Sequence, residues 1–193
     1  MAFIAKIIVA GDGAVGKTAL RRTFMGTAFD GQYLMTIGAD FSVKEIRLNT
    51  PGSDVMKFQI WDLAGQPRFQ EVRSVYYSGI VGAILMYDIT RPDSFENTPK
   101  WLMEIKKHSK KGAVPVVLLA NKIDLKDKIN YCISTSEGLA LSSAISKYYW
   151  DEEYFADIPY YETSAKTGEN VEDAFHKLGE MILKMREKWK NKS

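Results

Sequence analysis

The sequence lacks the cysteines of a disulfide-bonded protein, the excess positive charge of a nucleic-acid-binding protein and, at its N-terminus, an apolar run long enough to span a membrane. Cys132 is its single cysteine, which excludes a disulfide framework and is typical of a reducing compartment. The 26 basic and 24 acidic residues leave a net charge of only +2, so no broad basic surface favours nucleic acid. The apolar residues 1–10 (MAFIAKIIVA) are too short to span a bilayer and have no cleavage pattern, which indicates a buried strand instead of a signal peptide.

The C-terminal tail, about residues 186–193 (REKWKNKS), contains no cysteine, so we expect no prenyl anchor on this chain. Its basic residues lie beside Met185 and Trp189 and favour, at most, weak peripheral contact with an anionic membrane. A solvated basic helix end, stabilised by the helix dipole, is the simpler interpretation. We expect a cytoplasmic monomer, peripheral at most to the cytoplasmic face of a membrane.

What the sequence does contain is an alternation of apolar strands and amphipathic helices. Its 193 residues, of which 46% are hydrophobic, suit a single domain spanning 1–193. Continuous apolar runs at Phe3–Ala10, Ala83–Met86 and Val114–Ala120 predict buried parallel strands. Helical spacing appears in Phe95–His108 and again in the last segment after Asn170.

A hairpin is predicted early in the chain. The segments Phe41–Leu48 and Lys57–Trp61 flank the turn residues 50–54, which favours two antiparallel strands. A short strand is expected at Pro159–Tyr161. The whole pattern predicts an α/β fold with a mostly parallel central sheet, one antiparallel strand and helices on both faces. Ligands of such sheets bind beyond the carboxyl ends of the strands.

A phosphate-binding loop is predicted at residues 11–18 (GDGAVGKT), which match G-x-x-x-x-G-K-[ST] between a strand and a helix. The glycines let backbone N–H groups point inward, and the helix N-terminus adds positive potential. Lys17 can then reach the β- and γ-phosphates, and the Thr18 hydroxyl can bind Mg²⁺. The loop does not distinguish adenine from guanine nucleotides.

A base-recognition loop is predicted at residues 121–124 (NKID), after an apolar strand. The Asp124 carboxylate can accept from the neighbouring N1–H and N2–H₂ of guanine, and adenine offers no such pair. The Lys122 stem can cover one face of the base, and Asn121 can tie this loop to the phosphate loop. In residues 162–166 (ETSAK), the Ala165 N–H could donate to guanine O6, although a simple turn at a helix start explains this segment equally well.

These motifs together resemble the Ras superfamily of small GTP-binding proteins, from Phe3 to about Lys188. The Rab branch is most similar, through YLMTIGADF (33–41), KFQIWDLAGQPRF (57–69) and YYSGIVGAILMYDIT (76–90). The resemblance implies the P-loop NTPase fold of a small G protein. It also implies GTP or GDP and Mg²⁺ as cofactors.

The resemblance assigns roles to matched positions. It implies Mg²⁺ ligands at Thr18, Thr36 and Asp62. It implies catalytic roles for Gln66, which orients the attacking water, and for Lys17, Gly65 and Thr36. It implies nucleotide contacts from Gly11, Asp12, Gly13, Ala14, Val15, Gly16, Lys17, Thr18, Ala19, Phe29, Tyr33, Thr36, Gly65, Asn121, Lys122, Asp124, Ser164, Ala165 and Lys166.

The function implied is a molecular switch that hydrolyses GTP and engages effectors, exchange factors and activating proteins through its switch regions, in membrane trafficking or related signalling. We expect slow intrinsic hydrolysis, because the phosphate loop and first switch offer no evident arginine finger. Arg68 and Arg73 are expected to be exposed helix charges. Two alternatives stay open: a GTP-binding scaffold without hydrolysis and an ATP-dependent metabolic phosphotransferase.

The sequence also departs from the family pattern. Leu63 stands where Thr is usual, which predicts a change in core contacts. Pro67 replaces an acidic residue and restricts the backbone of Gln66, so we expect a working loop with a modified hinge. The segment 147–159 is longer than expected and is either a partner-binding surface or a helix extension and loop packed on the body.

Overall fold

The computed structural model describes residues 3–27, 36, 38–48, 55–150 and 157–190. Within these residues, one sheet of 6 strands runs through the molecule in the order β2-β3-β1-β4-β5-β6. The strands are β1 Phe3–Ala10, β2 Ala39–Arg47, β3 Val55–Leu63, β4 Gly82–Asp88, β5 Val116–Asn121 and β6 Tyr160–Thr163. The α-helices are α1 Lys17–Phe24, α2 Gln70–Ser74, α3 Pro92–Glu96, α4 Thr98–His108, α5 Thr135–Tyr149 and α6 Val171–Lys190. Short 3₁₀ turns are η1 Pro67–Phe69, η2 Val75–Tyr77 and η3 Ile123–Lys128.

The sheet has the predicted mixed topology. β2 runs antiparallel to β3, with Ala39 opposite Leu63 and Arg47 opposite Val55. Every other neighbouring pair in the sheet is parallel. The predicted hairpin is therefore confirmed in its two strands, while its turn at 49–54 lies outside the described residues. The fold class expected from the sequence is confirmed.

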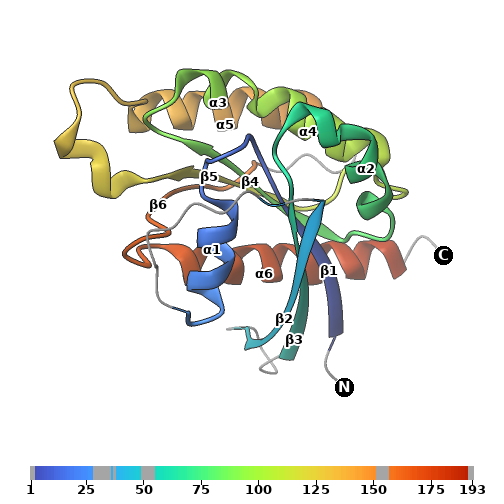
Figure 1. The fold of residues 1–193 in the computed structure, drawn as a ribbon. Helices are drawn as coiled ribbons and strands as arrows, with labels where there is room; N and C mark the ends of the chain where they lie inside the picture. The colour runs from blue at the N-terminus through green and yellow to red at the C-terminus, as the bar shows by residue number, and fades with distance from the viewer. Residues whose placement is uncertain (1–2, 28–35, 37, 49–54, 151–156, 191–193) are drawn as a thin grey trace.

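Helices cover both faces of the sheet, as Figure 1 shows: α1 and α6 lie below it in that view, and α3, α4 and α5 lie above it. β1 explains why both faces need cover. Its side chains alternate, so that Ile7 and Val9 enter the cluster with α1 and α6, while Ile8 and Ala10 enter the opposite cluster. A strand buried on both faces is continuously apolar, as predicted.

The two cores differ in their aromatic contents. On the α1 and α6 side, the rings of Phe24 and Phe175 stack with centroids 3.7 Å apart. On the other side, Leu102 and Ile105 of α4 pack with Tyr149 of α5. Burying side chains of this size contributes roughly 1.5–3 kcal/mol each to folding. No helix in the described ranges has the length and apolar character to cross a membrane.

Two predicted elements need correction. The helix expected over 95–108 begins earlier, at Pro92, and is divided at Asn97 into α3 and α4. Pro99 explains the division, because it has no N–H for the Phe95 carbonyl one turn earlier. The strand expected at Pro159–Tyr161 continues to Thr163, where it pairs with Asn121 of β5.

The ends of the long segment 147–159 pack on the body of the protein. Tyr149 and Trp150 are buried in the core beside α4, and Ile158 is buried as well. The Ile158 N–H donates to Ser146 Oγ at 2.8 Å. These contacts favour the packed helix extension for the described part, and residues 151–156 lie outside it.

Candidate functional site

The candidate site lies where the parallel strands end. β1, β3, β4, β5 and β6 share one direction, so their carboxyl ends meet at one edge of the sheet. The predicted phosphate loop follows β1, and the predicted base-recognition loop follows β5. The sheet therefore brings together motifs that are more than a hundred residues apart in the sequence.

Lys17 lies inside the loop that follows β1. It is the first residue of α1 and is 6% exposed. Its Nζ donates to the carbonyls of Gly11 at 2.8 Å and Asp12 at 2.7 Å. Burial lowers the pKa of Lys17 to about 8, although Asp62 and Asp12 oppose that shift. A buried ammonium at a helix N-terminus makes this loop an anion-binding concavity.

Gly65 approaches this loop so closely that no side chain fits. A Cβ on Gly65 would lie 2.4 Å from both the Asp12 carbonyl carbon and Lys17 Nζ. Gln66 follows on the same side, with Cγ 3.5 Å from where a Gly13 Cβ would be. Gly65, predicted to contact the γ-phosphate, and Gln66, predicted to orient the attacking water, thus lie directly against the phosphate loop.

Three oxygen-bearing side chains converge beside Lys17. Thr18 Oγ1 donates to Asp62 Oδ2 at 2.5 Å and lies 3.1 Å from Thr36 Oγ1. Asp62 is fully buried at the end of β3, and its Oδ1 has no hydrogen-bond partner among the described residues. Burial raises the pKa of Asp62, opposed by the Thr18 hydrogen bond and by the charges of Lys17 and Arg21.

This donor set fits the Mg²⁺ that the resemblance implies. Mg²⁺ prefers hard oxygen ligands and is commonly held by one or two carboxylates together with phosphates and water. Thr18, Thr36 and Asp62 offer two hydroxyls and a carboxylate with an unsatisfied oxygen. A bound dication would also favour the ionised form of the buried carboxyl.

Asn121 joins the two loops, as the sequence predicts. Its Nδ2 donates to the Val15 carbonyl at 2.8 Å, and its Oδ1 accepts from the Ala165 N–H at 3.0 Å. Gly16 is required beside it, because its φ is +105° and a Cβ would lie 2.3 Å from Asn121 Nδ2. The Ala165 N–H predicted to contact a base is therefore already engaged, and a guanine O6 would compete with the amide for it.

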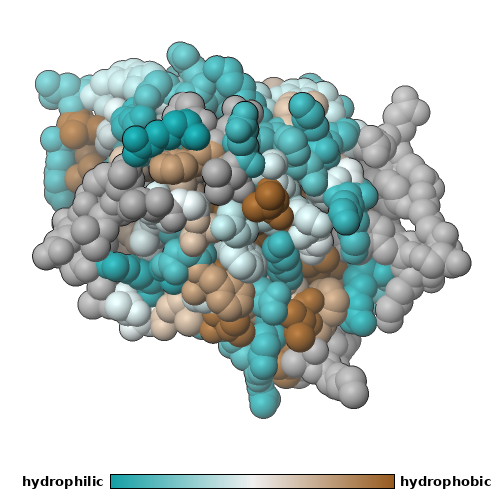
Figure 2. All heavy atoms as spheres, turned by 45° about the vertical axis from the view of Figure 1, so that its right-hand side comes forward, coloured by the Kyte–Doolittle hydropathy of each residue, from teal (hydrophilic) through white to brown (hydrophobic). Residues whose placement is uncertain are grey.

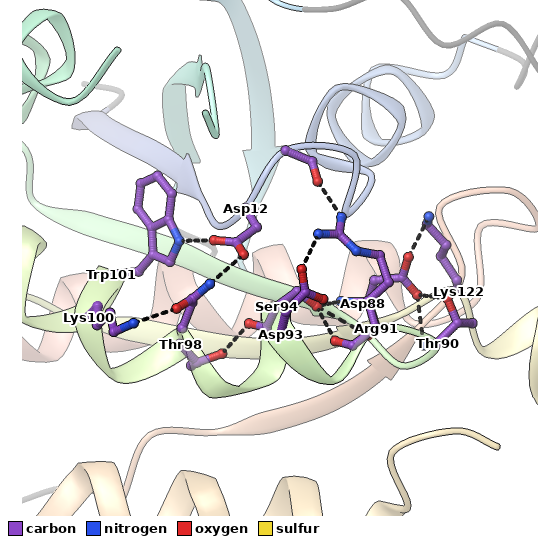
Figure 3. Close-up of polar contacts among 12 residues, drawn as sticks. Asp12, Asp88, Thr90, Arg91, Asp93, Ser94, Thr98, Lys100, Trp101 and Lys122 are labelled. Atoms are coloured by element: carbon purple, nitrogen blue, oxygen red, sulfur yellow. Dashed lines mark hydrogen bonds and ion pairs between the residues drawn. The ribbon is translucent and has the colours of Figure 1, made fainter. Parts of the chain in front are cut away.

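Asp124 and Lys122 are positioned by neighbouring elements. Asp124 Oδ1 accepts from the buried Ser164 hydroxyl at 2.7 Å, which joins the segments after β5 and β6. Lys122 adopts a left-handed φ of 72°, and its Nζ lies 2.6 Å from Asp88 Oδ2 at the end of β4. Figure 3 shows this pair beside the Thr90–Ser94 turn. Lys166 is exposed next to this cluster.

A support behind the phosphate loop was not found by sequence reasoning. Asp12 accepts from Trp101 Nε1 at 2.7 Å and from Asn97 Nδ2 at 2.9 Å, and Figure 3 shows the tryptophan edge facing the carboxylate. Arg91 donates to the Gly13 carbonyl at 2.6 Å. These side chains come from the α3–α4 region, so only the folded sheet places them here.

Some predicted site residues lie outside the described part of the chain, and one prediction of exposure is wrong. Phe29 and Tyr33, predicted to contact the nucleotide, lie outside the described residues. Arg68 is exposed, as expected. Arg73 is not, because it is 3% exposed and bound to Glu104 of α4 and to two carbonyls. Leu63 is fully buried in the core beside α4, so its side chain contributes to core contacts.

Comparison with known proteins agrees with this geometry. Residues 6–184 match the sequence profile described as the Ras family. The chain is 40% identical over 178 residues to Ras-related protein Rab-10 of Diplobatis ommata, covering 92% of this chain and 80% of that protein. It is 39% identical over 183 residues to Ras-related protein Rab7 of Drosophila melanogaster, covering 93% and 81%.

A third relative, Ras-related protein Rab-8B of Homo sapiens, is 36% identical over 181 residues and covers 94% of this chain and 79% of its own length. The similarity thus spans the phosphate loop, the hydroxyl and carboxylate cluster and the segments after β5 and β6. The chain belongs to the Ras family of small GTPases and is similar to its Rab proteins.

Proposed function

We propose that this protein is a guanine-nucleotide switch that binds GTP with Mg²⁺ and hydrolyses it to GDP and phosphate. The observation that carries the proposal is the convergence of Thr18, Thr36 and Asp62 beside Lys17, within reach of Gly65. Family membership and the Rab-named relatives support the same activity. We propose further that residues 1–193 form a single monomeric GTPase domain.

In the proposed reaction, the residues of the site chiefly position and stabilise charge. Lys17 and the inward N–H groups of residues 13–18 hold the phosphates, and Mg²⁺ would neutralise part of their charge. The Gly65 N–H contacts the γ-phosphate, and Gln66 orients a water for attack. Residues 11–18 and 28–40 contain no arginine, so intrinsic hydrolysis is slow. A partner protein that inserts an arginine would raise the hydrolysis rate by a factor of roughly 10³–10⁵.

Guanine is the base that Asp124 favours. The carboxylate can accept from two guanine donors at once, and Ser164 already orients it. An ATP-dependent phosphotransferase would have to tolerate a carboxylate against an acceptor edge of adenine. Competition between GTP and ATP for the purified protein separates the two readings, because only the guanine switch prefers GTP.

A partly exposed aromatic row supports recognition by effectors. Phe41 of β2 is 45% exposed and contacts Trp61 of β3, whose ring in turn meets Tyr76 after α2. The row runs from the end of the first switch to the second switch, so loss of the γ-phosphate would disturb both its ends. Figure 2 shows hydrophobic patches interspersed with hydrophilic residues on one face of the molecule.

The proposed cellular setting follows from the relatives. The Rab-named proteins support a role in membrane trafficking, with the switch acting in the cytoplasm or at the cytoplasmic face of a membrane. Effectors, exchange factors and activating proteins would bind through the switch regions.

The alternative is a GTP-binding scaffold in which Pro67 disables Gln66. The backbone carbonyl of Gln66 accepts from the Phe69 N–H at 3.1 Å and from Arg73 at 2.8 Å, so the turn is formed around the proline. An ordered turn beside Gly65 favours a working loop over a disabled one.

The test is to identify the nucleotide that co-purifies with the protein and then to time its turnover. We expect GDP or GTP in near-stoichiometric amount, and conversion of loaded GTP to GDP in a single slow phase that requires Mg²⁺. Bound GTP that never turns over would favour the scaffold. A purified protein that holds no guanosine phosphate and does not bind one would contradict both.

A further inference from the structure

Arg73, in α2, is an unusual residue to find buried in a helix of the second switch. Arginine is among the residues least often fully buried, and it is so only when its charge and donors are paired. Arg73 is 3% exposed, and its guanidinium Nε and NH2 lie 3.2 and 3.3 Å from the two carboxylate oxygens of Glu104. This fork anchors α2 to α4.

The remaining donor of the fork reaches the backbone around Gly65. Arg73 NH1 donates to the Ala64 carbonyl at 3.1 Å and to the Gln66 carbonyl at 2.8 Å. One guanidinium therefore holds the peptide group before Gly65 and the peptide group after Gln66. A lysine could not donate to both carbonyls and also bind the two carboxylate oxygens of Glu104, because its ammonium lacks the planar fork of a guanidinium.

The Ala64 contact also fixes the direction of the Gly65 N–H. The Ala64 carbonyl and the Gly65 N–H belong to one planar trans peptide, so they point in opposite directions. With the carbonyl directed at Arg73, the N–H points away from α2. Gly65 lies directly against Asp12 and Lys17, so the phosphate loop is the neighbour on its other side.

The same anchor supports the phosphate loop. The Arg73 guanidinium lies 4.3 Å from the centre of the Trp101 ring, and Trp101 Nε1 donates to Asp12 at 2.7 Å. Figure 3 shows Trp101 directed at Asp12 from α4. Consequently, α4 holds the phosphate loop through Trp101 and the Gly65–Gln66 backbone through Arg73.

We propose that Arg73 is a positioning residue for GTP hydrolysis, which holds the Gly65–Gln66 backbone so that the Gly65 N–H and the Gln66 side chain meet the γ-phosphate and the attacking water. The inference rests on the proposed GTPase function and deepens it. Among the described residues, Arg73 contacts the Ala64 and Gln66 carbonyls, Glu104, Tyr77 and Trp101, so it would act through the backbone that it holds.

The experiment compares Arg73→Met and Arg73→Lys with the unaltered protein, each loaded with GTP and Mg²⁺. Methionine keeps a buried stem without donors, and lysine keeps the charge without the fork. Misplacing a catalytic group by about 1 Å can cost roughly a hundredfold, so we expect single-turnover hydrolysis to fall by about tenfold to a hundredfold in both variants. GDP affinity should stay unchanged and GTP affinity should fall, because only GTP carries the γ-phosphate.

Tyr77→Phe is the matched control. It removes the Tyr77 hydroxyl, which donates to Glu104 at 2.8 Å and also contacts Arg73, and it keeps the Arg73 side chain that donates to the Ala64 and Gln66 carbonyls. We expect lower thermal stability with a normal hydrolysis rate per loaded molecule. The inference would be overturned if Arg73→Lys or Arg73→Met had the same single-turnover hydrolysis rate and the same ratio of GTP to GDP affinity as the unaltered protein.

The remaining outcomes are equally decisive. If Tyr77→Phe slows hydrolysis as much as the Arg73 variants do, the cluster acts only by structural stability and the inference is wrong. If Arg73→Met does not fold, Arg73→Lys alone decides by the same two measurements. If the unaltered protein binds GTP without turnover, the proposed hydrolysis itself is refuted. That outcome differs from one in which the unaltered protein and the Arg73 variants hydrolyse GTP at the same rate, which refutes only the role of Arg73.

Discussion

Single buried polar residues hold the site together. Asn121 shows how: its amide is 1% exposed and joins the loop after β1, through Val15, to the segment after β6, through Ala165. Leaving such partners unsatisfied costs about 1–3 kcal/mol for each buried group. Asp124 depends on the same arrangement, because Ser164 on the neighbouring segment orients its carboxylate.

At this scale, Asp124→Asn should exchange the base preference from guanine to xanthine. The asparagine amide offers one donor to the O2 of xanthine and still accepts from N1–H, whereas guanine presents a donor to that new donor. A hydrogen bond to a charged group contributes about 1.5–3 kcal/mol, which corresponds to a loss of GDP affinity of roughly tenfold to a hundredfold. Competition between GDP and xanthosine diphosphate measures the change.

Asp127→Asn provides the matched control, because Asp127 is exposed in the same 3₁₀ turn. It should leave the base preference as it is. An Asp124→Asn protein that still prefers GDP by the original ratio would show that the carboxylate does not read the base.

Among the elements, the second switch is the one in which neighbouring contacts matter most. η1 begins at Pro67 and leads into α2, and α2 is fixed to α4 through Arg73 and Glu104. The segment from Pro67 to Arg73 is therefore restricted at its start by the proline and fixed at its end by the ion pair with Glu104. A proline at the start of a helical turn is already in its preferred backbone region, and it restricts the residue before it.

Pro67→Glu should loosen this element. Without the proline, the unfolded chain gains freedom, and the free energy of unfolding should fall by about 0.4–1 kcal/mol. Gln66 gains conformations, so nucleotide release stimulated by an exchange factor should become faster, while hydrolysis persists. Chemical denaturation and single-turnover assays, with and without partner proteins, give both quantities. Release and hydrolysis rates identical to those of the unaltered protein would refute the modified-hinge hypothesis.

For the molecule as a whole, the nucleotide is expected to act as part of the fold. Segments after β1, β3, β5 and β6 meet at one edge of the sheet, with buried Lys17 and Asp62 between them. A ligand that bridges these segments stabilises the folded state only, because the unfolded chain cannot assemble the site.

We therefore expect removal of nucleotide and Mg²⁺ to lower the thermal stability. Saturation at about a thousand times Kd contributes roughly 4 kcal/mol, and each kcal/mol corresponds to roughly 2–4 °C in Tm for a protein of this size. Calorimetry of the stripped protein with added Mg²⁺ and GDP measures the gain. Mg²⁺ with ADP serves as the control, and an equal gain with ADP would contradict a guanine-specific site.

Much of this protein is determined by short-range patterns in its sequence. The apolar run of β1, the alternation of β2 and the glycines around Lys17 each act through backbone geometry or side-chain periodicity, which need no distant partner. That is why the mixed sheet, the helices on both faces and the family could be predicted. The division of the helix at Asn97 was missed because helical spacing alone does not register the N–H that Pro99 lacks.

Only the tertiary structure decided what surrounds the motifs. Arg73 was expected to be an exposed charge, since a polar residue in a short helix is usually solvated, but the packing of α2 on α4 buries it against Glu104 and Trp101. The tertiary structure also decided the role of Trp101, whose hydrogen bond to Asp12 joins residues 89 positions apart. Contacts of this kind depend on how the helices pack at the edge of the sheet. Local patterns in a single sequence do not indicate which residues far apart in the chain will meet there.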